Sequence, residues 1–418
     1  MKKELCLRCK GGKFLCGISY CPIIVKNKAL APIRKILPSL KNKYYGPSPP
    51  SIFVGRFGYP KVFIGPMGSL NWDNIELMDE PDKWKTDFAL ENVINLRAKL
   101  FRFMGEPINV SNISSSSKIL EVTQEQIQAD NPIDLEIKFS NKPKIDLSFN
   151  NYTQPLGVRF KIDSLTMVSN PKINNILDKV VNDTDLNALT AVDNLYQSKY
   201  SVTQISRILS AGLLGEKNKR KLVPTRWSIT ATDDIIGNSI RERISSYKPL
   251  EELLVFYNSY LDNDFWTLFI PKDYWQFNYH ESWKQGSSWN PSDPSPDILT
   301  DNEGPNGRKS YATNTVGGYY AARLAVLEKL ERLKRIASVI TIREVGRGYA
   351  IPLGVWQVRE NMRKSLNQPH AKFDSLADAL KYVEKRLTIP IIYYYRRSPI
   401  LNRKTLDDFF ISLKQQSY

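Results

Sequence analysis

The sequence of 418 residues contains only two histidines, His280 and His370. A chain with two imidazoles cannot build a catalytic centre that needs three or more, which excludes most His-rich metallohydrolase sites. The pattern GxxxxGK followed by Ser or Thr is absent, and so is GxSxG, so a P-loop NTPase or an α/β-hydrolase is not expected. No apolar run reaches the roughly 18 residues that a membrane helix needs.

The first six residues contain no apolar segment of the kind that a secretory signal carries. Together with the missing membrane span, this leads us to expect a cytoplasmic protein without a membrane partner. Apolar residues make up 42% of the chain and charged residues 24%, which is typical of a globular protein rather than a disordered or fibrous one. The length suggests two or three folded units.

Patterns typical of helices and of strands both occur along the chain. Residues 133–139 alternate strictly between apolar and charged side chains, which predicts a strand, and apolar residues three and four positions apart predict a helix over 320–337. Two short apolar runs that flank residues 56–60 predict a β-hairpin with a five-residue loop. We also expect a helix over 84–104 and a strand over 391–395.

These patterns place the chain in the α+β class, as a mixed core with a small N-terminal zinc module and a flexible C-terminal peptide. The longest polar, proline-rich connection covers residues 285–309 and marks the predicted internal boundary. The expected parts are a basic head (1–45), the N-terminal part of the core (46–290), its helical C-terminal part (291–395) and a tail (396–418).

Positive charge is concentrated near the N-terminus. The chain has 59 Lys and Arg against 43 Asp and Glu, a net charge of +16, and residues 1–60 hold twelve of the cations and one acid, Glu4. Such a block attracts a polyanion, so we favour nucleic acid as the partner over a charge that only maintains solubility. The candidate nucleic-acid-binding residues are Arg8, Lys10, Lys13, Arg56, Arg220 and Lys221.

All four cysteines lie within sixteen residues, at Cys6, Cys9, Cys16 and Cys21. Two residues between the first pair allow both thiolates to face one ion, and four thiolates complete a tetrahedral zinc site with no open position. The spacing therefore predicts a structural zinc ion. Two disulfides are the alternative, and a reducing cytosol disfavours them.

A group of polar residues in the middle of the chain could form a catalytic site. Arg226 could neutralise a phosphate, and Asp233 and Asp234 supply the oxygen ligands that Mg²⁺ or Mn²⁺ prefers. The alternative is structural, since Thr232 or Asp233 could cap a helix that continues through residue 244.

His280 and Glu281 form a second candidate, as an acid and base pair within an aromatic segment, residues 256–289. The alternative for His280 is a hydrogen-bonded core residue. The aromatic rings of this segment could stack on bases, but so many rings in one segment are first of all expected to form core.

The last part of the chain carries an apolar cluster at Leu406, Phe409 and Phe410. One helical turn places these side chains together, as an anchor for a partner's pocket, unless they pack back on the protein itself. The segment resembles a PCNA-interacting peptide, the motif that docks DNA enzymes on the sliding clamp. Arg403 stands where that motif begins with Gln, which should weaken one polar contact and leave the apolar anchor intact.

Nearly the whole chain resembles the archaeal NreA family of DNA repair proteins. The resemblance lies in the cysteine head, in the tail and in long literal stretches at residues 49–60, 221–234, 317–324 and 352–356. It implies a DNA repair factor that binds DNA and docks on the PCNA clamp, and the family name suggests a nuclease.

Three functions follow as alternatives. The first is a repair factor with metal-dependent nuclease, phosphodiester or DNA-end processing activity, centred on Arg226, Asp233 and Asp234. The second is a non-catalytic adaptor between DNA and the clamp. The third is an RNA-binding or ribosome-associated zinc protein.

Overall fold

The computed structural model describes residues 3–17, 20–70, 72–84, 88–113, 117–140, 157–287, 289–290, 295–351 and 353–402. The chain forms two compact units, and each is built from two separate stretches of sequence. Unit 1 comprises Met1–Ser239 with Ala350–Glu360, and unit 2 comprises Ile240–Tyr349 with Asn361–Tyr418. Helices and sheets occur in both units, so the predicted mixed α+β class is confirmed.

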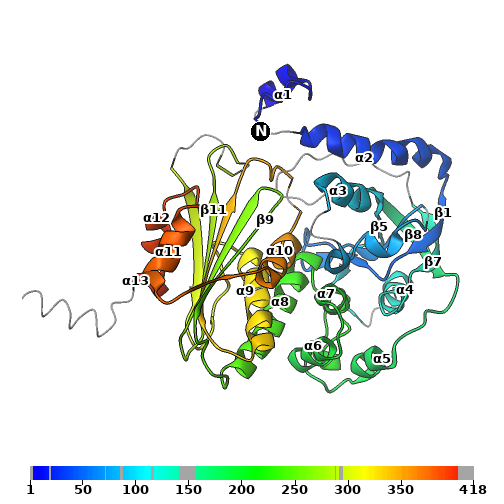
Figure 1. The fold of residues 1–418 in the computed structure, drawn as a ribbon. Helices are drawn as coiled ribbons and strands as arrows, with labels where there is room; N and C mark the ends of the chain where they lie inside the picture. The colour runs from blue at the N-terminus through cyan, green and yellow to red at the C-terminus, as the bar shows by residue number, and fades with distance from the viewer. Residues whose placement is uncertain are drawn as a thin grey trace, which may run out of the picture. The chain divides into compact units, whose positions relative to one another are not determined.

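Unit 1 is built on a six-stranded sheet with the strand order β1-β7-β8-β5-β4-β2 (Figure 1). Neighbouring strands are antiparallel except for β5 and β8, which run parallel. The strands are β1 (Lys43–Ser48), β2 (Ile52–Val54), β4 (Ile64–Gly68), β5 (Phe101–Met104), β7 (Ile133–Phe139) and β8 (Arg159–Met167), and a separate two-stranded sheet pairs β3 (Lys61–Val62) with β6 (Ile108–Asn109).

The helices of unit 1 begin where short polar side chains can satisfy free backbone N–H groups. Ser117, Asn174, Asn187 and Ser201 accept such bonds at the starts of α4 to α7. The helices are α1 (Lys3–Cys9), α2 (Pro22–Ile36), α3 (Leu90–Lys99), α4 (Lys118–Gln126), α5 (Asn175–Asn182), α6 (Ala188–Gln197), α7 (Val202–Ser210) and α8 (Thr225–Ile244), with short 3₁₀ turns at Leu37–Ser39, Ile75–Leu77, Pro81–Lys83 and Lys217–Lys219.

A core of apolar residues lies between the sheet of unit 1 and its helices. Phe101 and Phe103 of β5 and Phe160 of β8 contact one another through edge-on and tilted rings and are fully buried. Leu30 and Ile33 of α2 belong to the same cluster. Burial of such rings is the main favourable term for a core of this kind.

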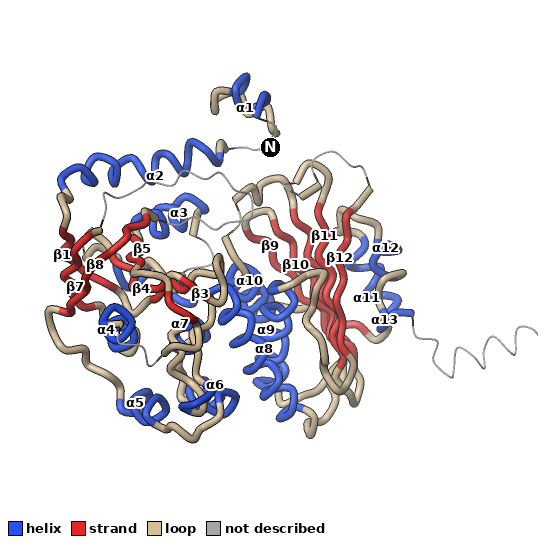
Figure 2. The backbone as a smooth tube through the Cα atoms, turned by 180° about the vertical axis from the view of Figure 1, so that it is seen from behind, coloured by secondary structure: helices blue, strands red, loops and turns tan. Residues whose placement is uncertain are grey.

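Unit 2 contains a second six-stranded sheet, with the order β12-β11-β13-β10-β9-β14. Helix α9 lies against one face of this sheet and α11 to α13 against the other (Figures 1 and 2). The elements are β9 (Leu253–Tyr260), β10 (Asn263–Ile270), β11 (Gln276–Trp283), β12 (Asp297–Glu303), α9 (Gly317–Leu333), β13 (Ser338–Val345), α10 (Trp356–Asn367, which starts in unit 1), β14 (Ala371–Phe373), α11 (Leu376–Glu384), α12 (Ile391–Tyr395) and α13 (Pro399–Asn402).

One predicted element is confirmed only in part, and a second is wrong in type. The helix expected over 84–104 ends at Lys99, and Phe101–Met104 forms β5, because pairing with β4 and β8 buries its side chains. The strand expected over 391–395 is the helix α12, which starts after Pro390 and turns Tyr394 inward to donate a hydrogen bond to Glu344 at 3.0 Å.

Residues 396–402, which the sequence assigned to the C-terminal peptide, pack with α12 and α13 on the sheet of unit 2. Ser398 is fully buried and Leu401 is 8% exposed. Residues 396–402 are therefore part of the folded unit. Within the described ranges, no helix is both long and apolar enough to cross a lipid bilayer.

Candidate nucleic-acid interface

A loop of unit 1, residues 55–63, carries an exposed set of rings and cations. Its base is closed by a hydrogen bond from the Gly55 N–H to the Phe63 carbonyl at 2.8 Å, and a second bond, from the Lys61 N–H to the Gly58 carbonyl at 2.9 Å, closes a turn within it. Gly58 has a φ of +85°, a region that side-chain-bearing residues rarely adopt, so the turn requires glycine. The predicted hairpin is therefore present between β2 and β4, with a longer loop than expected.

The loop lies beside the start of α8. The backbone N–H of Val54 donates to Thr225 Oγ1 at 2.9 Å, and the rings of Tyr59 and Trp227 stand 5.1 Å apart at an angle of 58°. Residues 170 positions apart in sequence thus meet on the surface of unit 1. We call the exposed residues of this region the aromatic–basic surface, and it consists of Arg56, Phe57, Tyr59, Lys61, Arg226 and Trp227.

The rings of this surface are unusually accessible. Phe57 is 80% exposed, Tyr59 49% and Trp227 45%, and the Arg56 guanidinium lies 5.0 Å from the Phe57 ring centre. Large apolar side chains grouped in this way on a surface indicate a binding site more often than isolated ones do. A ring with an adjacent cation can take both the flat face and the negative charge of a nucleotide.

A buried ion network supports the segment that leads into β2. Arg207, which is 5% exposed, ion-pairs with Glu80 and Asp79 and donates to the Pro50 carbonyl at 3.2 Å. Asp79 also accepts from Ser51 and pairs with Arg97. Burial, and then the charges of Arg207 and a neighbouring arginine, lower the pKa of Arg97 to about 9. The network fixes residues 50–51, and with them the entry to the loop.

Arg220 and Lys221 precede α8 and differ in their surroundings. The Arg220 guanidinium donates to the carbonyls of Gly215 at 2.7 Å and Val181 at 2.8 Å, and burial lowers its pKa. These bonds hold Arg220 between the end of α5 and the turn at Gly215. Lys221 is exposed.

The structure does not gather Arg226, Asp233 and Asp234 at one point. Helix α8 begins at Thr225, so Asp233 lies in its middle and does not cap it. Asp233 is fully buried and accepts from Arg359 Nη1 at 2.8 Å. The half-buried Asp234 accepts from Asn238, one turn further on. Adjacent helix positions point about 100° apart, and Arg226 lies about 10 Å before Asp233 along the axis.

His280 and Glu281 likewise point to opposite faces of β11. His280 is fully buried beside the Tyr394 ring and shares a hydrogen bond with Thr300 at 2.8 Å. Burial, and to a smaller extent the charge of Arg397, lowers the pKa of His280 to about 3, so its ring is neutral.

Glu281 faces the start of α9 instead. It pairs with Arg343 at 2.7 Å, and its carboxylate stands 3.2 Å from where a side chain on Gly318 would begin. Arg343 therefore neutralises Glu281, and the two candidate residues do not meet. The other aromatic residues of the segment are mostly core, with Trp266, Trp275 and Trp283 at 1%, 2% and 6% exposed.

The N-terminal head contains the four predicted zinc ligands as free thiols. Cys6 and Cys9 lie on α1, and the following turn contains Gly11 with a φ of +75°. A side chain on Gly11 would begin 3.5 Å from Cys21 Sγ, and backbone N–H groups, foremost that of Leu15, lower the pKa of the Cys9 thiol. The donors are the right ones for zinc. Even so, no three cysteine, histidine or acidic side chains of the described ranges are close enough to hold a metal.

The remaining predicted residues divide into two groups. Arg8, Lys10 and Lys13 are exposed on the head, beside the exposed ring of Phe14. The apolar cluster of the tail lies outside the described residues, at Leu406, Phe409 and Phe410.

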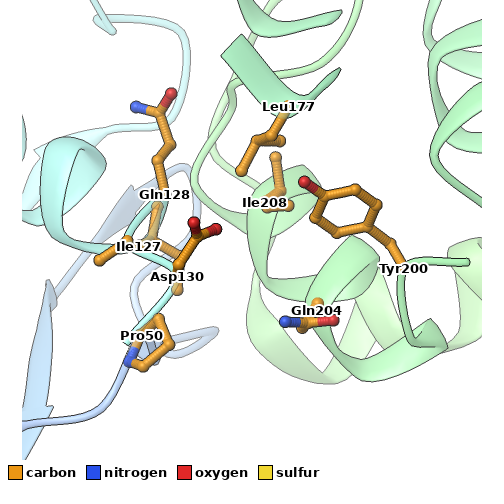
Figure 3. Close-up of a pocket in the computed structure, with 9 residues that line it drawn as sticks. Pro50, Ile127, Gln128, Asp130, Leu177, Tyr200, Gln204 and Ile208 are labelled. Carbon is orange, nitrogen blue, oxygen red and sulfur yellow. The ribbon is translucent and has the colours of Figure 1, made fainter. Parts of the chain in front are cut away.

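A pocket between α4, α5 and α7 of unit 1 is too small for an organic ligand. Its lining includes Asp130, Leu177 and Tyr200 (Figure 3). Its volume of about 20 Å³ holds about one water molecule. The volume of this pocket therefore excludes it as a binding site for an organic ligand.

Sequence reasoning missed most of the aromatic–basic surface. Arg56 and Arg226 were predicted as site residues, whereas Phe57, Tyr59, Lys61 and Trp227 were not. Phe57 and Tyr59 in a predicted turn were the available signal, because a turn at the surface has no core to cover its rings. The approach of Trp227 depends on the tertiary fold.

The fold and this surface define a two-unit α+β protein with an exposed cluster of rings and cations. Residues 15–290 match the family model described as archaeal Nre, N-terminal, and residues 303–409 match that described as archaeal Nre, C-terminal. The chain belongs to the archaeal Nre family, as its sequence motifs predicted.

Three relatives align over most of their length. The DNA repair protein NreA of Archaeoglobus fulgidus is 39% identical, over 91% of this chain and 93% of its own. The DNA repair protein NreB of the same organism is 35% identical, over 97% and 99%. The DNA repair protein NreA of Haloferax volcanii is 34% identical, over 85% of each chain. No solved structure matches the chain.

Proposed function

We propose that this protein is a DNA repair factor that binds DNA through the aromatic–basic surface and the cationic head. The observation that carries the proposal is the meeting of exposed rings and cations from two distant segments, joined by the contact of Tyr59 with Trp227. The names of the three relatives, which are DNA repair proteins, support the repair role.

The binding is tested with fluorescently labelled DNA and the full-length protein at near-physiological salt. We expect saturable binding that weakens when Arg56 and Lys61 are both changed to Gln. In the control, two exposed lysines elsewhere in unit 1 are changed to Gln: Lys118 at the start of α4 and Lys172 before α5. Loss of affinity in the control alone, or no binding by the wild type, would contradict the proposal. An RNA strand of the same sequence that binds much more tightly would favour an RNA-binding protein instead.

We further propose that the C-terminal segment docks on the PCNA sliding clamp. The support is the spacing of Leu406, Phe409 and Phe410 in the sequence, which would bring three apolar side chains to one side of a helix formed on binding. Changing both phenylalanines to Ala should abolish co-elution with purified clamp and leave DNA binding intact. Unchanged co-elution would refute this docking mode.

A structural zinc ion in the head is the next part of the proposal. Its support is the set of four thiols within sixteen residues and the turn at Gly11, whose backbone passes close to Cys21 Sγ. Purified protein should contain one zinc per chain by elemental analysis, and Cys9→Ser should lose it. A metal-free protein with all thiols reactive and a folded head would refute the zinc site.

For the chemistry, the geometry favours an adaptor over a metal-dependent nuclease. Asp233 is buried in an ion pair with Arg359, Asp234 accepts a hydrogen bond from Asn238, and Arg226 lies about 10 Å before Asp233 along the axis of α8. A panel of DNA structures incubated with Mg²⁺, Mn²⁺ or EDTA separates the two functions. The nuclease would be established if the wild type forms a product only with metal and an Asp233→Asn variant of unchanged stability forms none.

A further inference from the structure

We propose that the aromatic–basic surface binds unpaired nucleobases, so that the protein selects single-stranded or locally opened DNA over intact duplex. This inference rests on the proposed DNA binding and adds the state of the DNA that is bound. The chemical class of the ligand is a strand of nucleotides whose base faces are free.

The first argument is the accessibility of the rings. In a duplex the base faces are covered by their stacked neighbours, and only groove edges and phosphates are open to a protein. Phosphates require cations and gain nothing from apolar rings. The exposure of Phe57, Tyr59 and Trp227 at 80%, 49% and 45% is therefore useful for a ligand that offers flat π faces.

The second argument is the geometry of the rings. Tyr59 and Trp227 meet at 58° and 5.1 Å, so the two rings are not stacked face to face, and both remain exposed. Phe57 has the Arg56 guanidinium within 5.0 Å of its ring centre, and a guanidinium plane is itself a stacking partner for a base. Two segments thus contribute stacking groups that adjacent nucleotides of one strand could occupy.

The third argument is charge. Arg56, Lys61 and Arg226 are exposed, whereas the sequence contains no acidic residue between positions 49 and 72 or between 221 and 232. No nearby carboxylate in these segments repels a phosphodiester. An apolar peptide could also cover the rings, but it would bring no negative charge to the exposed cations Arg56 and Lys61.

The experiment compares three labelled ligands of equal length: a thymidine 20-mer, a duplex, and the same duplex with a central unpaired bubble. Affinity is measured by fluorescence anisotropy with the full-length wild type and with Phe57→Ala and Trp227→Ala. The control is Trp72→Ala, because Trp72 is also exposed in unit 1, at 51%, yet is followed by an acid and lies outside the surface. Thermal melting verifies that each variant is folded.

We expect the wild type to bind strand and bubble more tightly than duplex. Each of the two variants should lose about 5- to 100-fold in affinity for the strand and little for the duplex, while Trp72→Ala should match the wild type. Tryptophan emission should also be quenched by the strand, and less so in Trp227→Ala.

The outcomes separate this inference from the proposed function. Equal affinity for strand and duplex, with no effect of either ring variant, would refute base stacking while DNA binding stands. Absence of binding to all three ligands would refute the proposed function itself. Ring variants that keep full DNA affinity but lose co-elution with the clamp would identify the surface as a protein interface and overturn the inference.

Discussion

Buried charged and titratable side chains are single residues on which the stability of this protein depends strongly. The side chains of Arg207, Arg343 and Arg359 are almost completely enclosed, and each pairs with a carboxylate. Removing one partner leaves the other charge without compensation in a poorly solvating interior, and this is costlier than losing an exposed pair.

The pair of Asp233 and Arg359 gives a prediction at this scale. Arg359→Met should destabilise unit 1 by about 3 to 5 kcal/mol, because the buried Asp233 carboxylate would lose its ion pair. Glu136→Gln is the control, since its pair with Lys43 is exposed and 4.0 Å long and should contribute less than about 1 kcal/mol. Chemical unfolding measures both. Equal stabilities would show that the buried pair does not hold α8.

His280 gives a second prediction, on pH. The pKa of His280 falls from the ordinary 6.5 to about 3 on folding. At a pH between these two values the unfolded chain therefore binds one proton that the folded chain does not bind. The stability due to the neutral ring is therefore complete above pH 6.5 and is lost as the pH falls toward 3. Between pH 7 and pH 5 this amounts to about 2 kcal/mol.

The test compares melting of the wild type with that of His280→Gln. The variant should lose less stability on acidification, although it is less stable at pH 7. His370→Gln is the matched control, because His370 is the other histidine and lies outside this buried site. Parallel pH profiles for the wild type and His280→Gln would contradict the assignment.

Asp233 also illustrates a limit of sequence reasoning at the residue scale. Adjacent aspartates beside an arginine were interpreted as a metal and phosphate site, yet the actual partner of Asp233 is 126 positions away. Local spacing does not contain such a contact, because only the tertiary fold brings α10 to α8. Arg56 and Arg226 were recognisable, since both lie near predicted element ends at the surface.

At the scale of elements, the loop between β2 and β4 depends on one backbone conformation. Gly58 has a φ of +85°, and an added Cβ would stand 2.8 Å from the Lys61 carbonyl. Gly58→Ala should therefore strain the loop by about 1 to 3 kcal/mol and weaken DNA binding by displacing Phe57 and Tyr59. Gly304→Ala is the control, because a Cβ there meets no atom within 4 Å. Titration with labelled DNA is the measurement, and indistinguishable variants would refute a preset loop.

Elements were predictable where one local pattern agreed with the fold. The alternation of residues 133–139 gave β7 with its correct ends, because one face of that strand is buried and the other is solvated. Local pattern failed where tertiary contacts decided the outcome. Residues 101–104 follow a helix without a break yet form a buried strand, and the tyrosine-rich run 391–395 is helical because Tyr394 reaches Glu344.

At the scale of the whole molecule, the uneven charge predicts how binding responds to salt. Contact with phosphates releases counterions, so the logarithm of affinity falls linearly with the logarithm of salt concentration, by about 0.7 per contact for a single strand. If the head contributes, changing Arg8, Lys10 and Lys13 to Ala should reduce that slope by about 2. Changing Lys118, Lys172 and Lys179, which are exposed at α4 and α5, should leave it unaltered. Equal reductions would assign binding to overall charge rather than to the head.

The exposed Phe, Tyr and Trp rings of the 55–63 loop and α8 favour self-association of the protein when no ligand covers them. Because grouped apolar rings adhere to one another, concentrated protein freed of copurifying polynucleotide should aggregate, with a steady increase in light scattering. Addition of a short oligothymidylate should reverse this increase. Storage as a complex, rather than as the bare chain, is then the practical route to homogeneous samples.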